Sequence, residues 1–180
     1  MLRKSFWIPV LGLSLLLPAA SAQAQQYLEA GTFELTLSGS GASNEDLDAG
    51  SFGLGASFGY FPIDQLEVLV RQTVAYGDTD DATGGGTRVN ASTAVALDYH
   101  FDLDRWQPFV GVAVGYTYGD ADVDETFFGG PEVGVKYFVK EETFIYALAS
   151  YQFFFDDIDE VNDVANDGSF VYQVGVGFTW

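Results

Sequence analysis

His100 is the single histidine of this 180-residue chain, and imidazole is the side chain best suited to acid–base chemistry near neutral pH. Histidine-assisted hydrolysis also needs a nucleophile, usually a serine that the ring activates. No serine lies beside His100 in a recognisable nucleophile motif. We therefore interpret His100 as a hydrogen-bonded structural residue, and we assign the chain no catalytic residue, no cofactor and no metal ligand.

Carboxylates are the second group with chemical potential. The chain has 26 acidic and 7 basic residues and a net charge of −19, so it should repel nucleic acid. By our count, 16 of the carboxylates gather in four clusters. The clusters contain Glu45, Asp46 and Asp48; Asp78, Asp80 and Asp81; Asp120, Asp122, Asp124 and Glu125; and Asp156, Asp157, Asp159, Glu160, Asp163 and Asp167.

The third cluster begins like a calcium-binding loop, with aspartates at positions 120, 122 and 124. Glu125 stands where such a loop needs its turn glycine, and Pro131 stands where the bidentate glutamate belongs, so an EF-hand is excluded. Two interpretations stay open for the clusters. They form solvated, self-repelling loops, or they bind divalent cations weakly and bridge to anionic lipid headgroups.

The segments between these clusters alternate between bulky apolar and small or polar residues, which is the pattern of β-strands. In 106–118, for example, Val110, Val112 and Val114 share one face, while Gly111 and Ala113 share the other. No segment after residue 24 has 18 consecutive apolar residues, so a helical membrane span is excluded there. The eight predicted strands are 31–38, 51–60, 66–76, 88–101, 106–118, 131–139, 143–154 and 169–180.

The composition of the two strand faces predicts which one points outward. A soluble barrel, such as a lipocalin, would bury the bulky face, but the other face is mostly Gly, Ala, Ser and charge and could not form a dry core. An apolar exterior with aromatic residues near the strand ends suits lipid. The pattern therefore predicts an all-β fold, an eight-stranded antiparallel up-and-down transmembrane β-barrel, whose closure satisfies every backbone group.

The predicted connections alternate between long and short. In chain order they contain about 12, 5, 11, 4, 8, 3 and 13 residues. Outer-membrane barrels have long extracellular loops and short periplasmic turns. We therefore expect a protein of the outer membrane of a bacterium with two membranes, with periplasmic termini and extracellular acidic loops.

The N-terminal segment has the features of a secretory signal peptide. Arg3 and Lys4 precede an apolar run over 6–17, and small residues at 20 and 22 fit a cleavage site. We expect a signal peptide over 1–22, with cleavage after 24 as the alternative, and a barrel domain over 25–180. No Cys follows the cleavage site, which excludes a lipoprotein.

Parity along the predicted strands places three of the five mature basic residues inside the barrel, together with four carboxylates. Carboxylates in a narrow lumen need cationic partners, so we expect Arg71 and Lys136 to lie within reach of carboxylates and to leave no wide pore. A bulge at Pro131 is the alternative, because it would reverse parity and move charges to the rim. The predicted lumenal charge network is Glu34, Glu67, Arg71, Arg88, Asp98, His100, Glu132 and Lys136.

The last strand carries the most specific motif. Gln173, Gly175, Phe178 and Trp180 fit the pattern polar-x-Gly-x-x-aromatic-x-aromatic, and Trp180 replaces the more usual terminal Phe. The motif resembles the signal that the β-barrel assembly machinery recognises in outer-membrane substrates, and we expect this recognition to proceed by strand addition.

Three stretches carry a wider resemblance: 108–116 (PFVGVAVGY), 130–137 (GPEVGVKY) and the terminal strand. They resemble the small outer-membrane barrels typified by the OmpA transmembrane domain, OmpX and the opacity proteins. The chain stops at the barrel, so no peptidoglycan-binding domain is expected. The resemblance implies a monomer in outer-membrane lipid that depends on the assembly machinery.

Members of this group differ in function, so the fold alone does not assign one. The favoured hypothesis is a non-enzymatic integral outer-membrane protein with a structural or surface-interaction role. One alternative is a minor pore for small solutes. The other is a lipid A-modifying enzyme, because some eight-stranded barrels are lipid-modifying enzymes that use His with Ser or Asp.

Overall fold

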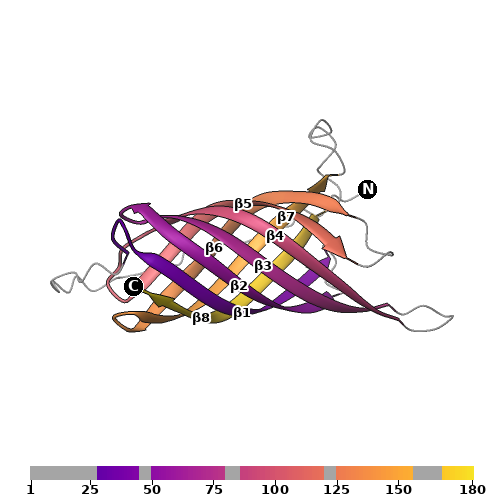
Figure 1. Ribbon diagram of the computed structural model, residues 1–180, viewed down its shortest axis with the longest axis horizontal. Helices are drawn as coiled ribbons and strands as arrows, with labels where there is room; N and C mark the ends of the chain where they lie inside the picture. The colour runs from indigo at the N-terminus through magenta and orange to yellow at the C-terminus, as the bar shows by residue number, and fades with distance from the viewer. Residues whose placement is uncertain (1–27, 45–49, 80–85, 120–124, 156–167) are drawn as a thin grey trace, which may run out of the picture.

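The computed structural model describes residues 28–44, 50–79, 86–119, 125–155 and 168–180, and within them it contains eight β-strands (Figure 1). No helix in these residues is long and apolar enough to cross a membrane. The strands are β1 (Phe33–Asn44), β2 (Gly50–Ile63), β3 (Leu66–Thr79), β4 (Gly86–His100), β5 (Trp106–Gly119), β6 (Thr126–Lys140), β7 (Thr143–Phe155) and β8 (Gly168–Thr179).

The strands form one closed antiparallel barrel in which each strand pairs with its neighbours in the sequence. Pairing of β1 with β8 closes the sheet, and reciprocal backbone hydrogen bonds of 3.0 and 3.1 Å join Phe33 to Trp180 at the end of this seam. Closure leaves no sheet edge unpaired. The predicted fold class is therefore confirmed.

The two ends of the barrel differ. We call the end with the β2–β3, β4–β5 and β6–β7 connections the turn end, and the opposite end the loop end (Figure 1). The residues that precede β1 and follow β8 also lie at the turn end. Two of its turns place a non-glycine residue at positive φ, Gln65 at 67° and Asp104 at 60°.

Several strands extend further toward the loop end than the sequence predicted. The prediction for β1 stopped at residue 38, whereas the strand continues to Asn44. The prediction for β6 began at Pro131, whereas the strand begins at Thr126. Residues 39–44 (GSGASN) and 126–130 (TFFGG) do not alternate between bulky and small side chains, so the pattern missed these extensions and overestimated the loops.

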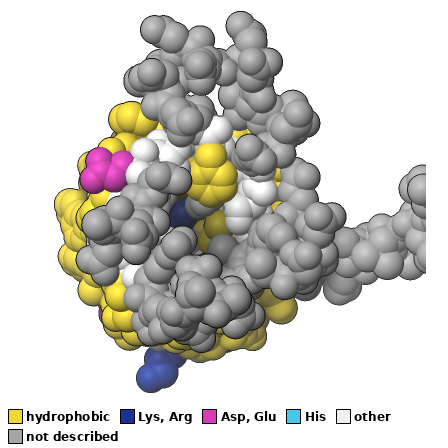
Figure 2. Space-filling model, turned by 90° about the vertical axis from the view of Figure 1, so that its right-hand side faces the viewer, with side chains coloured by type: hydrophobic (Ala, Val, Ile, Leu, Met, Phe, Trp, Pro, Cys, Tyr) yellow, Lys and Arg dark blue, Asp and Glu magenta, His cyan; other side chains and the backbone are white. Residues whose placement is uncertain are grey.

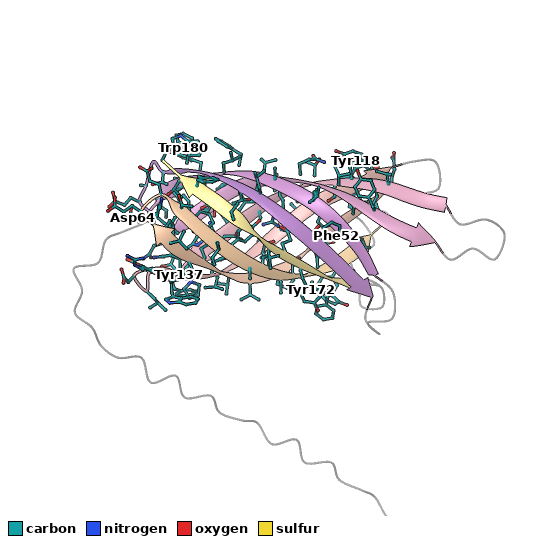
Figure 3. The ribbon with its side chains drawn as sticks, turned by 90° about the horizontal axis from the view of Figure 1, so that it is seen from below. Phe52, Asp64, Tyr118, Tyr137, Tyr172 and Trp180 are labelled. Carbon is teal, nitrogen blue, oxygen red and sulfur yellow. The ribbon has the colours of Figure 1, made fainter. Side chains whose placement is uncertain are left out.

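Large apolar side chains cover the outside of the barrel. Val112, Val114 and Val174 in the middle of their strands are 56%, 61% and 64% exposed. Aromatic residues lie toward both ends of this belt, with Trp180 and Tyr137 near the turn end and Phe52, Tyr118 and Tyr172 nearer the loop end (Figure 3). The bulky face of the alternating pattern therefore points outward.

The interior is less polar than the sequence predicted, and that expectation is wrong in part. Phe61, Phe138 and Phe144 form a buried cluster with Leu28 at the turn end, and Leu69 packs with Ala96 and Ala113 in a second cluster.

Glycines make room for the inward rings. The side chains of Phe109, Phe128 and Phe144 occupy the space that a Cβ atom would need at Gly134, Gly115 and Gly177 of the adjacent strands. A narrow barrel must be filled by side chains, and large residues facing small ones fill it most efficiently. Alternation within single strands does not reveal this complementarity.

Candidate functional site in the barrel lumen

Lys136 of β6 lies at the centre of the buried charges. Its Nζ atom donates hydrogen bonds to both carboxylate oxygens of Glu34, at 2.7 and 2.6 Å, and to Oε2 of Glu67 at 2.8 Å. The three side chains come from β6, β1 and β3, and each residue is at most 3% exposed. The ammonium group thus joins widely separated parts of the sheet across the lumen.

Aromatic rings surround this ammonium group. Nζ lies 5.6 Å from the ring centre of Phe61, 5.7 Å from that of Phe109 and 5.2 Å from that of Phe144. Ring faces attract cations electrostatically, and the attraction grows where water is excluded. We call Lys136, Glu34 and Glu67 the Lys136 cluster, and Leu28, Phe61, Phe138 and Phe144 the Leu28 cluster. The Lys136 cluster therefore packs directly against the Leu28 cluster at the turn end.

Arg71 of β3 forms the second charged contact, further toward the loop end. Its two terminal nitrogens donate to the two oxygens of Glu132 on β6, at 3.0 and 3.1 Å. This bidentate pairing gives fixed geometry as well as energy. The Glu132 side chain is fully buried, and the Arg71 side chain is 11% exposed. Because the two residues belong to β3 and β6, which are not neighbours in the sheet, the ion pair spans the lumen.

His100 and Asp98 lie on the same inward face of β4. Nε2 of His100 is 3.0 Å from Oε2 of Glu67, and the imidazole ring packs against Phe61 and Phe109 at centroid distances of 5.4 and 5.0 Å. Asp98 stands opposite Glu67 in the β3–β4 register and is 1% exposed.

The lumen changes character from the turn end to the loop end. The Leu28 cluster comes first, followed by the two charged contacts, and then by a cavity of about 290 Å³. Seen from the loop end, a basic side chain lies inside the mouth of the barrel, and apolar side chains cover the visible part of its outer wall (Figure 2). Arg71, Gln173 and Phe128 line the cavity together with Ser, Thr, Asn and Gln side chains.

Leu28 is the participant that the sequence analysis missed. The segment before β1 folds over the turn end, where the amides of Gly31 and Gln65 donate to the carbonyls of Phe61 and Leu28 at 2.8 and 3.1 Å. These bonds hold the Leu28 side chain, which is 2% exposed, against the Phe cluster. A single leucine ahead of the first strand carries no periodic signal, so the sequence offered little to find it.

Seven of the eight predicted lumenal residues have described side chains, and the structure brings all seven together inside the barrel. Arg88 belongs to β4, but its side chain lies outside the described part. Pro131 causes no register shift, because it pairs with Val112 in an uninterrupted β5–β6 ladder and faces outward. The parity of Glu132 and Lys136 is therefore preserved.

The residues of the predicted assembly signal divide between the two faces of β8. Gln173 points inward and is 5% exposed, whereas Phe178 and Trp180 are 45% and 58% exposed on the outside. Trp180 lies 6.2 Å from the ring centres of both Phe33 and Phe58. Gly175 leaves no space for a Cβ atom, which would meet the carbonyl of Leu37 and the ring of Tyr146.

Most acidic residues of the four clusters lie outside the described residues. Glu125 is described, and its Oε2 accepts a hydrogen bond of 2.7 Å from the Tyr116 hydroxyl. This contact joins the start of β6 to the loop end of β5.

A closed eight-stranded antiparallel barrel with an apolar exterior and a filled lumen is the fold of the small outer-membrane β-barrels. The crystal structure of the outer membrane protein OprG from Pseudomonas aeruginosa is similar, with a TM-score of 0.64 and 15% identity over 86% of this chain and 98% of that one. Neisserial surface protein A gives 0.60 and 22% over 82% and 95%. The N-terminal β-barrel domain of Pseudomonas aeruginosa OprF gives 0.54 and 19% over 84% and 98%.

Because the sequence identities are low, these comparisons show a shared fold and not a shared function. The predicted resemblance to small outer-membrane barrels is therefore confirmed for the fold. No protein-family model and no curated protein sequence matches the chain.

Proposed function

We propose that this chain is an integral outer-membrane protein whose barrel spans the bilayer as a monomer, presents its acidic loops at the cell surface and has no enzymatic activity. The apolar exterior carries this proposal. Monomeric soluble proteins rarely expose contiguous apolar patches larger than a few hundred Å². Here large apolar residues are exposed on all eight strands, which suits acyl chains and not water.

The orientation follows from the connections. Outer-membrane barrels place short turns and both chain ends in the periplasm, and longer loops outside. The two-residue turns at 64–65 and 141–142 lie at the same end as the residues flanking β1 and β8. This arrangement supports periplasmic turns and extracellular loops, where the acidic clusters would meet water, divalent cations or a surface partner.

A closed lumen argues against the pore alternative. The cavity at the loop end is the feature that favours a pore. Below it, however, the Arg71–Glu132 pair, the Lys136 cluster and the Leu28 cluster lie in succession. A solute would have to break buried ion pairs and displace packed rings, so we infer that the barrel conducts poorly.

The environment of His100 argues against the enzyme alternative. Its side chain has no exposed area and faces Glu67, Phe61 and Phe109. A lipid substrate in the surrounding bilayer would be separated from the imidazole by the wall of the barrel.

A pair of lysine substitutions tests whether the belt faces lipid. Val112 lies in the middle of β5 and Ile63 at the turn end of β2, and their exposures are similar, at 56% and 58%. A lysine at the bilayer midplane costs about 2–4 kcal/mol and one near the interface about 0–1 kcal/mol. We expect Val112→Lys to lower the folding stability in lipid vesicles far more than Ile63→Lys. Equal effects, or recovery of the chain in the soluble fraction of cells, would contradict the proposal.

A further inference from the structure

The cavity at the loop end has a volume of about 290 Å³ and is closed on the side of the turn end. The Arg71–Glu132 ion pair lies on that side, and so does Leu69, which precedes Arg71 on β3 and packs with Ala96 and Ala113. Sites for small molecules are concave spaces of about 300–1,000 Å³. The cavity is therefore the right size for one small organic molecule.

Hydroxyl groups line one side of this cavity. Thr73, Ser92 and Thr117 are direct partners in the β3–β4 and β4–β5 registers, and all three face the cavity. We call these three residues the hydroxyl wall. Asn90 adds a side-chain amide from β4. Because hydroxyl and amide groups both donate and accept hydrogen bonds, this side suits a molecule that also does both.

The opposite side of the cavity is more apolar. In the closed barrel, β7 and β8 lie across the lumen from β3 and β4. Phe154 of β7 and Val171 of β8 are half-buried and line the cavity there. Phe128 of β6 packs over Gly115 and extends the apolar surface. A molecule with hydroxyl groups on one edge and C–H groups on its faces would match both sides.

Two further polar side chains line the cavity. Arg71 donates two hydrogen bonds to Glu132, and its guanidinium has further N–H donors. Gln173 of β8 is 5% exposed, and its Oε1 atom has no hydrogen-bond partner among the described residues. An unpaired buried acceptor is costly. A hydroxyl group in the cavity would supply the missing donor after a small rotation of the Gln173 amide.

The charges around the cavity select against charged ligands. Arg71 is the one charged residue of the described lining, and Glu132 neutralises it. An anion would have to pass the acidic clusters, which belong to the connections at this end, and would meet no unpaired cation on the described lining. A cation would meet no carboxylate there. Burying an unpaired charge is costly, so the cavity favours a neutral molecule.

We propose that the loop-end cavity binds one neutral, hydroxyl-rich molecule of the size of a monosaccharide. Its C–H groups face Phe154 and Val171, and its hydroxyl groups bond to the hydroxyl wall and to Arg71. The ligand is a free sugar or the terminal residue of a glycan chain. The binding site does not depend on the proposed membrane orientation, which decides only that the ligand arrives from outside the cell.

NMR of backbone and side-chain amides tests the proposal on the mature chain, refolded in a detergent without a sugar headgroup. D-glucose, D-galactose and D-mannose are titrated separately. We expect at least one hexose to cause saturable shifts at Asn90, Ser92 and Gln173. The side-chain amide of Gln107, which donates to Asp102 at the turn end, should not shift.

Charged analogues test the selection for a neutral ligand. The uronic acid and the amino sugar of the hexose that binds carry a negative and a positive charge on the same ring. Each should bind at least about tenfold more weakly than the neutral hexose, because the cavity leaves either charge unpaired.

Variants place the ligand in the cavity. Ser92→Phe fills the cavity, whereas Val95→Phe changes a side chain on the outside of the same strand that is 47% exposed. Only Ser92→Phe should abolish the shifts. Thr73→Val replaces a hydroxyl with a methyl group of similar size and should weaken binding about three- to tenfold. This variant and the charged analogues still test the site if Ser92→Phe fails to fold.

A methyl glycoside distinguishes the two sources of ligand, because its blocked anomeric oxygen resembles that of a sugar at the end of a glycan chain. Binding equal to that of the free hexose supports a chain end, and weaker binding supports a free sugar.

The proposal is overturned if none of the three hexoses causes saturable shifts, since the cavity would then hold solvent alone. Charged analogues that bind as tightly as the hexose, or shifts that Ser92→Phe leaves unchanged, would also overturn it. These measurements are made in detergent, so such a failure is distinguishable from failure of the lysine test in lipid vesicles.

Discussion

Replacing Lys136 with methionine removes the cation that holds the lumen together at the turn end. Methionine preserves much of the apolar stem and its contacts with the surrounding rings. It provides no donor for the carboxylates of Glu34 and Glu67, which Nζ contacts at 2.6 to 2.8 Å. Both carboxylates are buried, so water cannot replace the lost hydrogen bonds.

The size of the effect follows from the burial of the partners. Removing one partner of a buried ion pair costs about 3–5 kcal/mol, because an uncompensated charge is left behind. An exposed lysine lacks such partners, and substitutions of that kind usually change stability by no more than about 0.5 kcal/mol. We therefore expect Lys136→Met to destabilise the barrel by about 3–5 kcal/mol and the exposed Lys140→Met to have almost no effect.

Urea titration of folding in lipid vesicles measures both values, with intrinsic tryptophan fluorescence as the signal. The double variant Glu34→Gln/Lys136→Met removes one charge of each sign and should recover part of the loss, which a double-mutant cycle quantifies. A cost below about 1 kcal/mol for Lys136→Met, or one equal to that of Lys140→Met, would refute the idea that the cluster stabilises the barrel.

Three further substitutions have expected outcomes. Trp180→Ala should reduce the membrane yield in cells more than Trp106→Ala, although the two side chains are similarly exposed, at 58% and 54%. The reason is that only Trp180 lies in the closing seam and in the predicted assembly signal. Gly177→Ala should cost about 1–3 kcal/mol in the urea assay because the new methyl group meets a buried ring, whereas Gly39→Ala has ordinary contact distances and should cost little. Leu28→Ala should cost about 2–5 kcal/mol by opening the apolar cluster, and an unchanged urea midpoint would mean that the segment does not seal the turn end.

Alternation with a period of two was sufficient to predict the eight strands and the direction of most side chains. A strand with two chemically different faces leaves little freedom in its orientation. Glu67 and Arg71, for example, share one parity, and the structure places both inside. The same parity holds through Pro131, because the proline faces outward and the β5–β6 ladder does not shift.

Contacts across the lumen could not be predicted in this way. Glu34 and Lys136 are 102 residues apart in the sequence, and their distance in space depends on how the strands are staggered around the closed sheet. The pairing of Phe144 with Gly177 likewise depends on the β7–β8 register. Parity identifies the residues that enter the lumen, whereas strand tilt and register decide which of them meet.

The position of tryptophan relative to the bilayer tests the central claim most directly. After removal of the predicted signal peptide, Trp106 and Trp180 are the only tryptophans in the sequence. Both side chains are exposed on the outside at the turn end, where Trp106 begins β5 and Trp180 follows β8. Lipids brominated at different depths quench tryptophan according to its distance from the bilayer centre. We predict that both emit from one depth, about 10–15 Å from the centre of a hydrocarbon core about 30 Å thick. Emission that brominated lipids leave unchanged, and that a water-soluble quencher removes, would contradict a membrane-spanning barrel.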